Sequence, residues 1–193
     1  MKGIGLIIVI ALVLLGAFML IKPSTSPTAT TTKGCTVTDS ATTTIAKATK
    51  ATIETDKGTI ELELYPDSAP KTVENFAKKA AENYFDCLRF HRVEDWVVQG
   101  GDPLSKNEAQ QSLWGTGGGE IETELSDRSF VEGALGVARG GDIKVSNDSQ
   151  FFIVKNDSQF LDKQYTIFGK VTSGMDVVKS IAVGDFIRSV TVQ

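Results

Sequence analysis

The sequence predicts a mainly β protein, in which a closed antiparallel β-barrel capped by two helices follows a membrane-spanning helix and a polar tether. Three observations lead to this prediction. The chain begins with a long apolar run, continues with a threonine-rich stretch, and then shows many short apolar runs separated by glycine-rich connections. We therefore divide the 193 residues into an N-terminal segment (1–22), a linker (23–49) and one domain (50–193) that is large enough for a single hydrophobic core.

The N-terminal segment has the length of a transmembrane helix. No charged residue occurs from Gly3 to Ile21, and a helix of this length spans about 28 Å, close to the hydrocarbon thickness of a bilayer. The run is longer than the apolar region of most signal peptides and lacks a clear cleavage site, so we expect an uncleaved anchor that holds the domain outside the cytoplasm. A cleaved signal with a secreted domain is the alternative, whereas a buried core helix is disfavoured because the run is apolar on every side. Lys2 and Lys22 flank the run, so positive charge does not settle its orientation.

The linker is rich in Thr, Ser, Ala and Pro, and eleven of its residues are threonine. Such a segment buries too little apolar surface to offset the entropy lost on ordering, so we expect a solvated tether. Cys35, Val37 and Ile45 interrupt this polarity, and the part of the linker around them could instead pack on the domain.

The domain opens with the pattern of a β-hairpin. Two runs, 51–54 and 59–64, flank Asp56-Lys57-Gly58, and in the second run apolar residues alternate with Glu61 and Glu63. This alternation predicts strands with one solvated face.

Two helices and five further strands are predicted along the rest of the domain. Ser68-Ala69-Pro70 begins a helix, with Pro70 tolerated in its first turn, and residues 175–181 repeat apolar side chains at helical spacing. The apolar stripe of the first helix is Val73, Phe76, Ala77 and Ala80. The short apolar runs that predict strands are 96–99, 134–138, 151–154, 167–171 and 187–192.

Charge and composition exclude several function classes. From residue 49 onward the chain has 16 basic and 23 acidic residues and no basic stripe, which disfavours nucleic-acid binding. His91 is the one histidine, so we expect no metal site and no cofactor. The glycine-rich loop 115–119 lacks the following lysine of a phosphate cradle. A nucleophile built from Cys87 and His91 would lack an orienting partner at a recognisable spacing.

The segment from Phe90 to Asp102 carries the strongest candidate site. Arg92 supplies a permanent cation, Trp96 and Val97 an apolar wall, and Gln99 an amide. On an extended strand Val97 and Gln99 share one face, so Trp96 reaches the same groove only if the strand twists or bulges there. An uncharged ligand with a carbonyl group and an apolar ring would suit such a groove.

This segment resembles the signature of cyclophilin-type peptidyl-prolyl cis-trans isomerases, and further motifs match in the family's order over residues 50–193. They are Ala134–Arg139, Ser149–Ile153, Phe160–Asp162 and Tyr165–Lys170. The resemblance implies an eight-stranded barrel with a helix at each end and a substrate groove on its outer wall. It also implies isomerisation of X-Pro peptide bonds, with proline-containing polypeptides as partners. We expect a monomer that assists the folding of exported proteins.

The resemblance assigns the catalytic role to Arg92. An X-Pro bond isomerises over a barrier of ~18–20 kcal/mol because twisting removes amide resonance. The twisted nitrogen becomes a hydrogen-bond acceptor, and a donor aimed at it stabilises the transition state over both planar states. The residues implied in substrate binding are Trp96, Val97, Gln99, Gly115, Gly117, Ala138, Arg139, Gly140, Gln150, Phe152, Phe160, Leu161 and Tyr165.

The sequence leaves alternatives for the role of Arg92 and for the function of the groove. Arg92 could be a surface arginine paired with Glu94 or Asp95, and the same groove could serve a non-catalytic proline-peptide-binding module or holding chaperone. By resemblance, His91 is a structural residue that points away from the groove. Phe151 and Phe168 are expected in the core.

The sequence departs from the family pattern at several places that bear on specificity and on binding of cyclosporin-like ligands. The loop from Arg92 to Trp96 is one residue shorter, the loop between Arg139 and Gln150 is longer, and 103–114 is an insertion. In addition, Tyr165 stands where better-known members have histidine, and Phe160 where they have tryptophan.

Cys35 and Cys87 are the only cysteines. Two cysteines of an exported protein are more often paired than free, and a disulfide between them would attach the end of the tether beside the candidate-site strand. Two unpaired thiols are the alternative, because geometry is not readable from sequence.

Overall fold

The computed structural model describes residues 34–35 and 48–193. The predicted membrane-spanning segment and nearly all of the linker lie outside these residues. Within the described ranges, no helix is long and apolar enough to cross a membrane.

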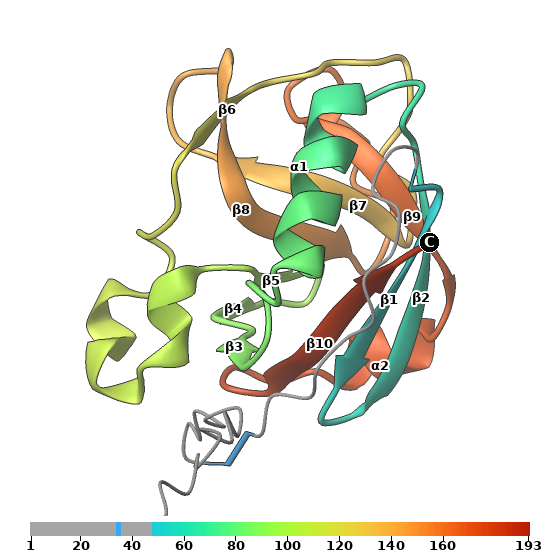
Figure 1. Ribbon diagram of the computed structural model, residues 1–193. Coiled ribbons are helices and arrows are strands. Elements are labelled where there is room, and N and C mark those ends of the chain that lie inside the picture. The colour runs from blue at the N-terminus through green and yellow to red at the C-terminus, as the bar shows by residue number, and fades with distance from the viewer. Residues whose placement is uncertain (1–33, 36–47) are drawn as a thin grey trace, which may run out of the picture.

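Ten strands form one curled antiparallel sheet (Figure 1). Their order is β3-β10-β1-β2-β9-β7-β8-β5-β4, and β6 pairs with β8. The strands are β1 (Lys50–Thr55), β2 (Gly58–Leu64), β3 (Leu88–Arg89), β4 (Arg92–Val93), β5 (Val97–Gly100), β6 (Glu120–Glu122), β7 (Ala134–Arg139), β8 (Val145–Val154), β9 (Ile167–Ser173) and β10 (Phe186–Val192).

The sheet has ten strands where the resemblance implied eight, and its strand order ends at two edge strands, β3 and β4, so a curled sheet replaces the expected closed barrel. One additional strand arises because a single segment contributes two short strands to opposite edges of the sheet. β3 pairs with β10, whereas β4 pairs with β5. Between them, the Phe90 amide donates to the Asp185 carbonyl at 3.0 Å and the His91 amide donates to the Gln99 carbonyl at 3.0 Å. The chain thus changes partners at Phe90 and His91, and the candidate arginine follows directly after this change.

The predicted hairpin and both helices are present. Strands β1 and β2 pair in register from Lys50↔Glu63 to Thr55↔Gly58. Helix α1 (Pro70–Ala81) begins with Pro70 and buries its predicted apolar stripe, and α2 (Met175–Ser180) ends one residue earlier than predicted. Figure 1 shows α1 lying against the sheet near β8 and β10.

The main core lies between α1 and the inner face of the sheet. The Phe76 ring centroid lies 5.0 Å from that of Phe85, 6.0 Å from that of Phe151 and 5.3 Å from that of Phe168. The predicted core positions of Phe151 and Phe168 are therefore confirmed, since both are buried in this cluster.

Strand β8 separates this core from a second apolar cluster on the outer face. Side chains alternate along a strand, so Phe151 and Ile153 enter the main core, whereas Phe152 and Val154 enter the second cluster. The second cluster consists of Val97, Phe130, Ala134, Phe152, Val154, Leu161 and Ile167, with Tyr65, Trp96, Ala138 and Tyr165 packed against it. Most of the predicted apolar site residues belong to this outer cluster.

Two glycines permit close approaches beside the outer cluster. Gly136 on β7 faces Phe152, and a Cβ atom there would lie 2.5 Å from Phe152 Cζ and 2.7 Å from Phe130 Cε1. Gly101 has a φ of +88°, and its Cβ would lie 2.1 Å from the Ser149 carbonyl oxygen. The first glycine makes room for the Phe152 ring, and the second lets the chain turn tightly after β5.

Cys35 and Cys87 form a disulfide, with their Cα atoms 5.7 Å apart. The bridged alternative is therefore confirmed, and both cysteines are buried in a small cluster with Phe186. The Arg188 guanidinium also donates to the Gly34 carbonyl at 2.6 Å. The residues just before and at Cys35 are thus fixed on β10 and on the turn that precedes β3.

A buried carboxyl group follows α1 and should make stability depend on pH. The side chain of Asp86 is 1% exposed, and its Oδ2 atom has no hydrogen-bond partner among the described residues. Burial raises the pKa of Asp86 to about 6, against a smaller lowering by Lys106. A raised pKa means that folding favours the protonated form, so this contribution is full below about pH 4 and is lost as the pH rises through about 6.

We therefore expect Asp86→Asn to stabilise the protein relative to wild type by about 1–2 kcal/mol more at pH 8 than at pH 4. Denaturant unfolding of both proteins at the two pH values measures this difference. Only the change with pH is diagnostic, because the amide also buries two N–H donors of its own. The exposed neighbour Glu82, changed to glutamine, is the control, and parallel pH profiles for wild type and Asp86→Asn would contradict the prediction.

Candidate functional site

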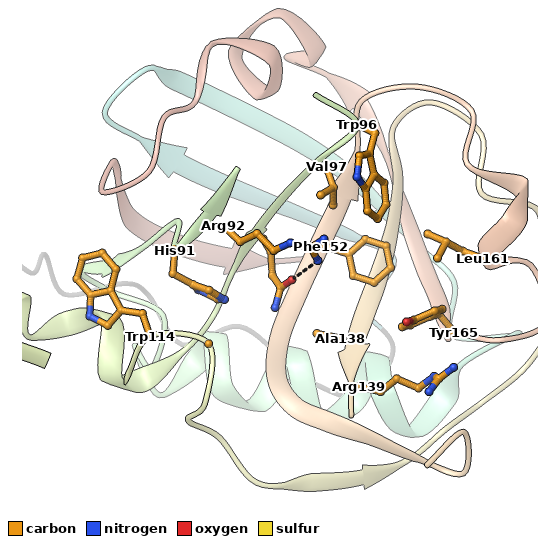
Figure 2. Close-up of a pocket in the computed structure, with 12 residues that line it drawn as sticks. His91, Arg92, Trp96, Val97, Trp114, Ala138, Arg139, Phe152, Leu161 and Tyr165 are labelled. Carbon is orange, nitrogen blue, oxygen red and sulfur yellow. Dashed lines mark hydrogen bonds between the residues drawn. The ribbon is translucent and has the colours of Figure 1, made fainter. Parts of the chain in front are cut away.

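A pocket of about 350 Å³ opens on the outer face of the sheet, where β4, β5, β7 and β8 meet (Figure 2). Twelve residues line it: His91, Arg92, Trp96, Val97, Gln99, Trp114, Gly115, Ala138, Arg139, Phe152, Leu161 and Tyr165. Nine of the thirteen residues that the sequence assigned to substrate binding are among them, together with Arg92.

Arg92 forms the charged wall of the pocket. It lies on β4 opposite Gln99 of β5, and its side chain is 44% exposed. Its Nε atom donates to Glu94 Oε1 at 2.7 Å, and its Nη1 atom donates to Gln99 Oε1 at 3.4 Å. The arginine is therefore ion-paired with Glu94, as one alternative from the sequence held, and it also lines the pocket. Its catalytic role stays a prediction.

The apolar wall is built by the outer cluster. The Phe152 ring stacks on Phe130 with centroids 5.5 Å apart and meets the edge of Tyr165 at 5.8 Å and 89°. Leu161, from the short 3₁₀ helix Gln159–Leu161, is also buried here. These contacts fix the Phe152 ring, so the apolar pocket is preformed.

Trp96 reaches the pocket because it precedes β5. The sequence placed it within a strand spanning 96–99, but β5 begins at Val97, and Trp96 lies in the bend before it. Val97 and Gln99 share the pocket face as predicted. The position of Trp96 thus needs no bulge in the strand.

Two glutamines connect the pocket to the glycine-rich loop. Gln99 Nε2 donates to Gln150 Oε1 at 2.9 Å, and Gln150 Nε2 donates to the carbonyls of Gly115 at 3.1 Å and Gly117 at 2.7 Å. Gln150 is 3% exposed and does not line the pocket. In this structure its side chain supports Gln99 and the loop.

Three other predicted residues also lie outside the pocket lining. Phe160 stands at the rim, 64% exposed, with its ring 5.4 Å from that of Trp96. Gly140 lines a neighbouring cavity of about 550 Å³ together with Gly118 and Gly119. In the sequence, Gly117 lies between Gly115, which lines the pocket, and Gly118, which lines the neighbouring cavity. Their roles in substrate binding stay predictions.

The inserted segment 103–114 supplies a pocket residue that the sequence did not predict. It forms two 3₁₀ helices, Pro103–Lys106 and Glu108–Leu113, and ends at Trp114 in the pocket wall. Trp114 Nε1 donates to the Asn107 carbonyl at 3.2 Å. The motifs that carry the family resemblance do not cover this insertion. The one sequence feature that could have indicated a pocket residue here is an aromatic side chain directly before the glycine-rich loop.

Asp102 holds the start of this insertion and the glycine loop together. It is fully buried, and its carboxylate accepts hydrogen bonds from the amides of Leu104 at 2.8 Å and Gly117 at 3.4 Å, and from the amide of Gly115. The carboxylate thereby replaces water for backbone donors that would otherwise be unpaired. Asp102 ends the signature segment in the sequence, and its position there indicates no role.

His91 lines the pocket, which corrects the expectation that it points away from the groove. Figure 2 shows its ring in the pocket wall. Burial lowers the pKa of His91, with Asp102 acting in the opposite direction, so the imidazole is neutral at neutral pH. The expectation rested on the resemblance alone; in the structure His91 lies between β3 and β4, where the chain changes partners, and its side chain reaches the pocket.

The site combines a permanent hydrogen-bond donor with a preformed apolar pocket. Cys87 is held in the disulfide, so it supplies no free thiolate for a nucleophile with His91. Among the described residues, no group of three or more His, Cys, Asp and Glu side chains could hold a metal ion. What the arrangement offers is binding of an apolar ring beside a cationic N–H donor.

Comparisons with known proteins identify the family of the chain. The family model for cyclophilin type peptidyl-prolyl cis-trans isomerase/CLD matches residues 50–192. Peptidyl-prolyl cis-trans isomerase B of Bacillus subtilis is 42% identical over 143 residues, which cover 72% of this chain and 93% of that protein. An isomerase of Rhizopus delemar is 40% identical over 139 residues, which cover 69% of this chain but 21% of that protein, so the chain spans about a fifth of that relative's length.

Solved structures share the fold. A cyclophilin-type isomerase of Cryptosporidium parvum matches with a TM-score of 0.66 at 25% identity and covers 76% of this chain and 98% of its own. A structure of that isomerase in the presence of the dipeptide Ala-Pro matches with a TM-score of 0.65 at 24% identity, covering 75% of this chain and 98% of its own. Since the family model spans the whole described sheet and the Bacillus subtilis isomerase is 42% identical with 93% of its length covered, the chain belongs to the cyclophilin-type peptidyl-prolyl cis-trans isomerase family.

Proposed function

We propose that the domain of residues 50–193 catalyses rotation about X-Pro peptide bonds in proline-containing polypeptides. The observation that carries this proposal is the position of Arg92, whose guanidinium lines the same pocket as the apolar side chains of Phe152, Leu161 and Tyr165. The pyrrolidine ring fits an apolar pocket, and the amide nitrogen of the same residue is then near the cationic wall.

Catalysis follows from a difference in binding between planar and twisted amides. In the planar states the nitrogen lone pair is delocalised, so it accepts a hydrogen bond poorly. In the twisted state the lone pair is localised on nitrogen, and an Arg92 N–H group binds it more strongly. Interactions that are stronger in the transition state than in the ground state lower the barrier.

The remaining pocket residues hold the substrate around the rotating bond. The Gln99 amide is fixed by Gln150 and would orient a substrate backbone group. Arg139 is engaged locally, since its Nε donates to the Gln164 carbonyl at 2.8 Å and its guanidinium carbon lies 4.4 Å from the Tyr165 ring centroid. We infer that Arg139 stiffens the Tyr165 side of the pocket, and that the backbone of β7 beside it receives the residues before the proline.

The direct test is the cis-to-trans relaxation of an Ala-Pro peptide in the presence of the full chain, solubilised in mild detergent. We expect relaxation much faster than the uncatalysed process, which takes tens of seconds. Arg128→Ala is the matched control for an Arg92→Ala variant. Like Arg92, Arg128 pairs with an acidic residue, Asp67, and its guanidinium carbon lies 3.6 Å from the centroid of an aromatic ring, that of Tyr65. A folded protein that binds the peptide without accelerating relaxation would contradict the isomerase and favour the binding module.

We further propose that the domain is exported and remains anchored by its N-terminal segment, where it would assist the folding of other exported chains. The disulfide supports export, because such bonds persist in oxidising compartments and are rare in the cytosol. The uncharged run Gly3–Ile21 supports the anchor. Fractionation of cells that express the full chain tests both points: recovery in the soluble cytoplasmic fraction with reduced cysteines would overturn the proposal.

A further inference from the structure

The turn between β4 and β5 places a carboxylate beside the candidate catalytic arginine. The Glu94 amide donates to the Val97 carbonyl at 2.9 Å, and the Val97 amide donates to the Glu94 carbonyl at 3.4 Å. These bonds close a hairpin with Asp95 and Trp96 at its tip. Because side chains alternate along a strand, Arg92 and Glu94 emerge on the same face.

The Glu94 carboxylate bridges two pocket residues. Its Oε1 atom accepts from Arg92 Nε at 2.7 Å, and its Oε2 atom accepts from Trp96 Nε1 at 2.9 Å. The guanidinium carbon of Arg92 lies 5.4 Å from the centroid of the Trp96 ring. Glu94 thus joins the charged wall and the aromatic wall of the pocket through one side chain.

The bridge leaves the substrate-facing end of the guanidinium available. Of its five N–H donors, the Nε–H group is occupied by Glu94, and Nη1 makes only a long contact of 3.4 Å to Gln99. Glu94 is two residues beyond Arg92 and pairs with Val97, the first residue of β5. This short turn brings the Glu94 carboxylate to the Nε atom of the Arg92 guanidinium. An arginine held at Nε is restricted in its last torsion angles, which otherwise sample many rotamers.

We propose that Glu94 is a positioning residue, which holds the Arg92 guanidinium and the Trp96 ring in the geometry needed for isomerisation. The inference rests on the proposed function. Stability is not its main effect, because Arg92 is 44% and Glu94 46% exposed, and ion pairs at such positions contribute little to folding. Orientation matters more for rate, since a misplacement of about 1 Å in a catalytic group can lower the rate by roughly 100-fold.

Three variants separate orientation from charge. Glu94→Ala removes both acceptors, and Glu94→Gln keeps one acceptor without the charge. Asp95→Ala removes a neighbouring exposed carboxylate that has no hydrogen bond or ion pair with any of the described residues. We expect Glu94→Ala to lower kcat by about 10-fold with KM changed by less than about 2-fold, because the lost orientation acts in the transition state. Glu94→Gln should retain a kcat between those of Glu94→Ala and wild type, and Asp95→Ala should match wild type.

Three outcomes would overturn the proposal. If Glu94→Ala has the kcat of wild type, the bridge has no part in catalysis. If Glu94→Ala and Glu94→Gln are faster than wild type, the carboxylate weakens the arginine as a donor and does not orient it. If Asp95→Ala lowers kcat as much as Glu94→Ala does, the effect comes from the negative charge of the turn and not from the hydrogen bonds of Glu94.

A second measurement keeps this inference distinct from the proposed function. The exchange of the Arg92 Nε–H proton with water, followed by NMR, should be slower in wild type than in Glu94→Ala, because the carboxylate holds that proton. This readout does not depend on activity. Slow relaxation of the Ala-Pro peptide with wild type would contradict the isomerase, whereas unprotected Nε–H in an active wild type would contradict the positioning role alone.

Discussion

Replacing Arg92 with alanine is expected to lower kcat/KM for an Ala-Pro peptide by about 100- to 1000-fold, the range found when one preorganised transition-state donor is removed. The pocket residues Phe152, Leu161 and Tyr165 would remain in the outer cluster, so peptide binding should weaken far less than turnover. Stopped-flow measurements of the isomerisation rate give kcat and KM, and a separate titration gives the peptide affinity. Together they test whether turnover falls while binding is largely kept.

The same change should have little effect on folding. Arg92 makes exposed contacts with Glu94 and Gln99, and losing them should change the free energy of unfolding by less than about 1 kcal/mol. Arg92→Lys keeps the charge but loses the planar fork of donors, and we expect it to restore only part of the rate. If Arg92→Ala is as active as wild type while correctly folded, the arginine has no role in the mechanism.

Breaking the disulfide should produce the largest loss of stability. The bond joins residues 52 apart in sequence, and closing a loop of this length restricts the unfolded chain by an amount that corresponds to about 4 kcal/mol in the chain-entropy estimate, with observed values of ~2–4 kcal/mol. We therefore expect Cys35→Ser to lower the free energy of unfolding by about 2–4 kcal/mol, as measured by denaturant unfolding.

The reduced wild type is the natural control for this variant. It lacks the same covalent constraint without any change of sequence, so its unfolding midpoint should fall toward that of Cys35→Ser. Cys87→Ser removes the same bond, and because both cysteines are buried in one cluster with Phe186, its midpoint should be similar to that of Cys35→Ser. Identical midpoints for oxidised and reduced wild type would show that the bond does not stabilise the native state.

Local patterns predicted much of the fold. Alternation of apolar residues and glutamates identified the first hairpin, because one face of β2 is buried and the other is solvated. The position of Pro70 fixed the start of α1, since proline is compatible only with the first turn of a helix. In the same way, the spacing of Val97 and Gln99 predicted two residues on one pocket face.

Features that depend on distant partners were not predictable. The division of residues 88–93 into β3 and β4 is determined by pairing with β10 and β5, two strands that are about 90 residues apart in the chain. The burial of Gln150 depends on the carbonyls of Gly115 and Gly117, which a sequence pattern does not place beside it. Trp114 enters the pocket through the fold of an insertion that has no apolar periodicity.

The disulfide also sets how far the pocket can operate from whatever holds the N-terminus. A fully extended chain spans at most about 3.5 Å per residue. If residues 1–22 are fixed at a surface, a first attachment at Cys35 limits the separation to roughly 45 Å, whereas attachment at the start of β1 would allow roughly 100 Å. The oxidised protein would then reach only polypeptides close to that surface. Reduction of the disulfide would about double the largest possible distance between the surface and the domain.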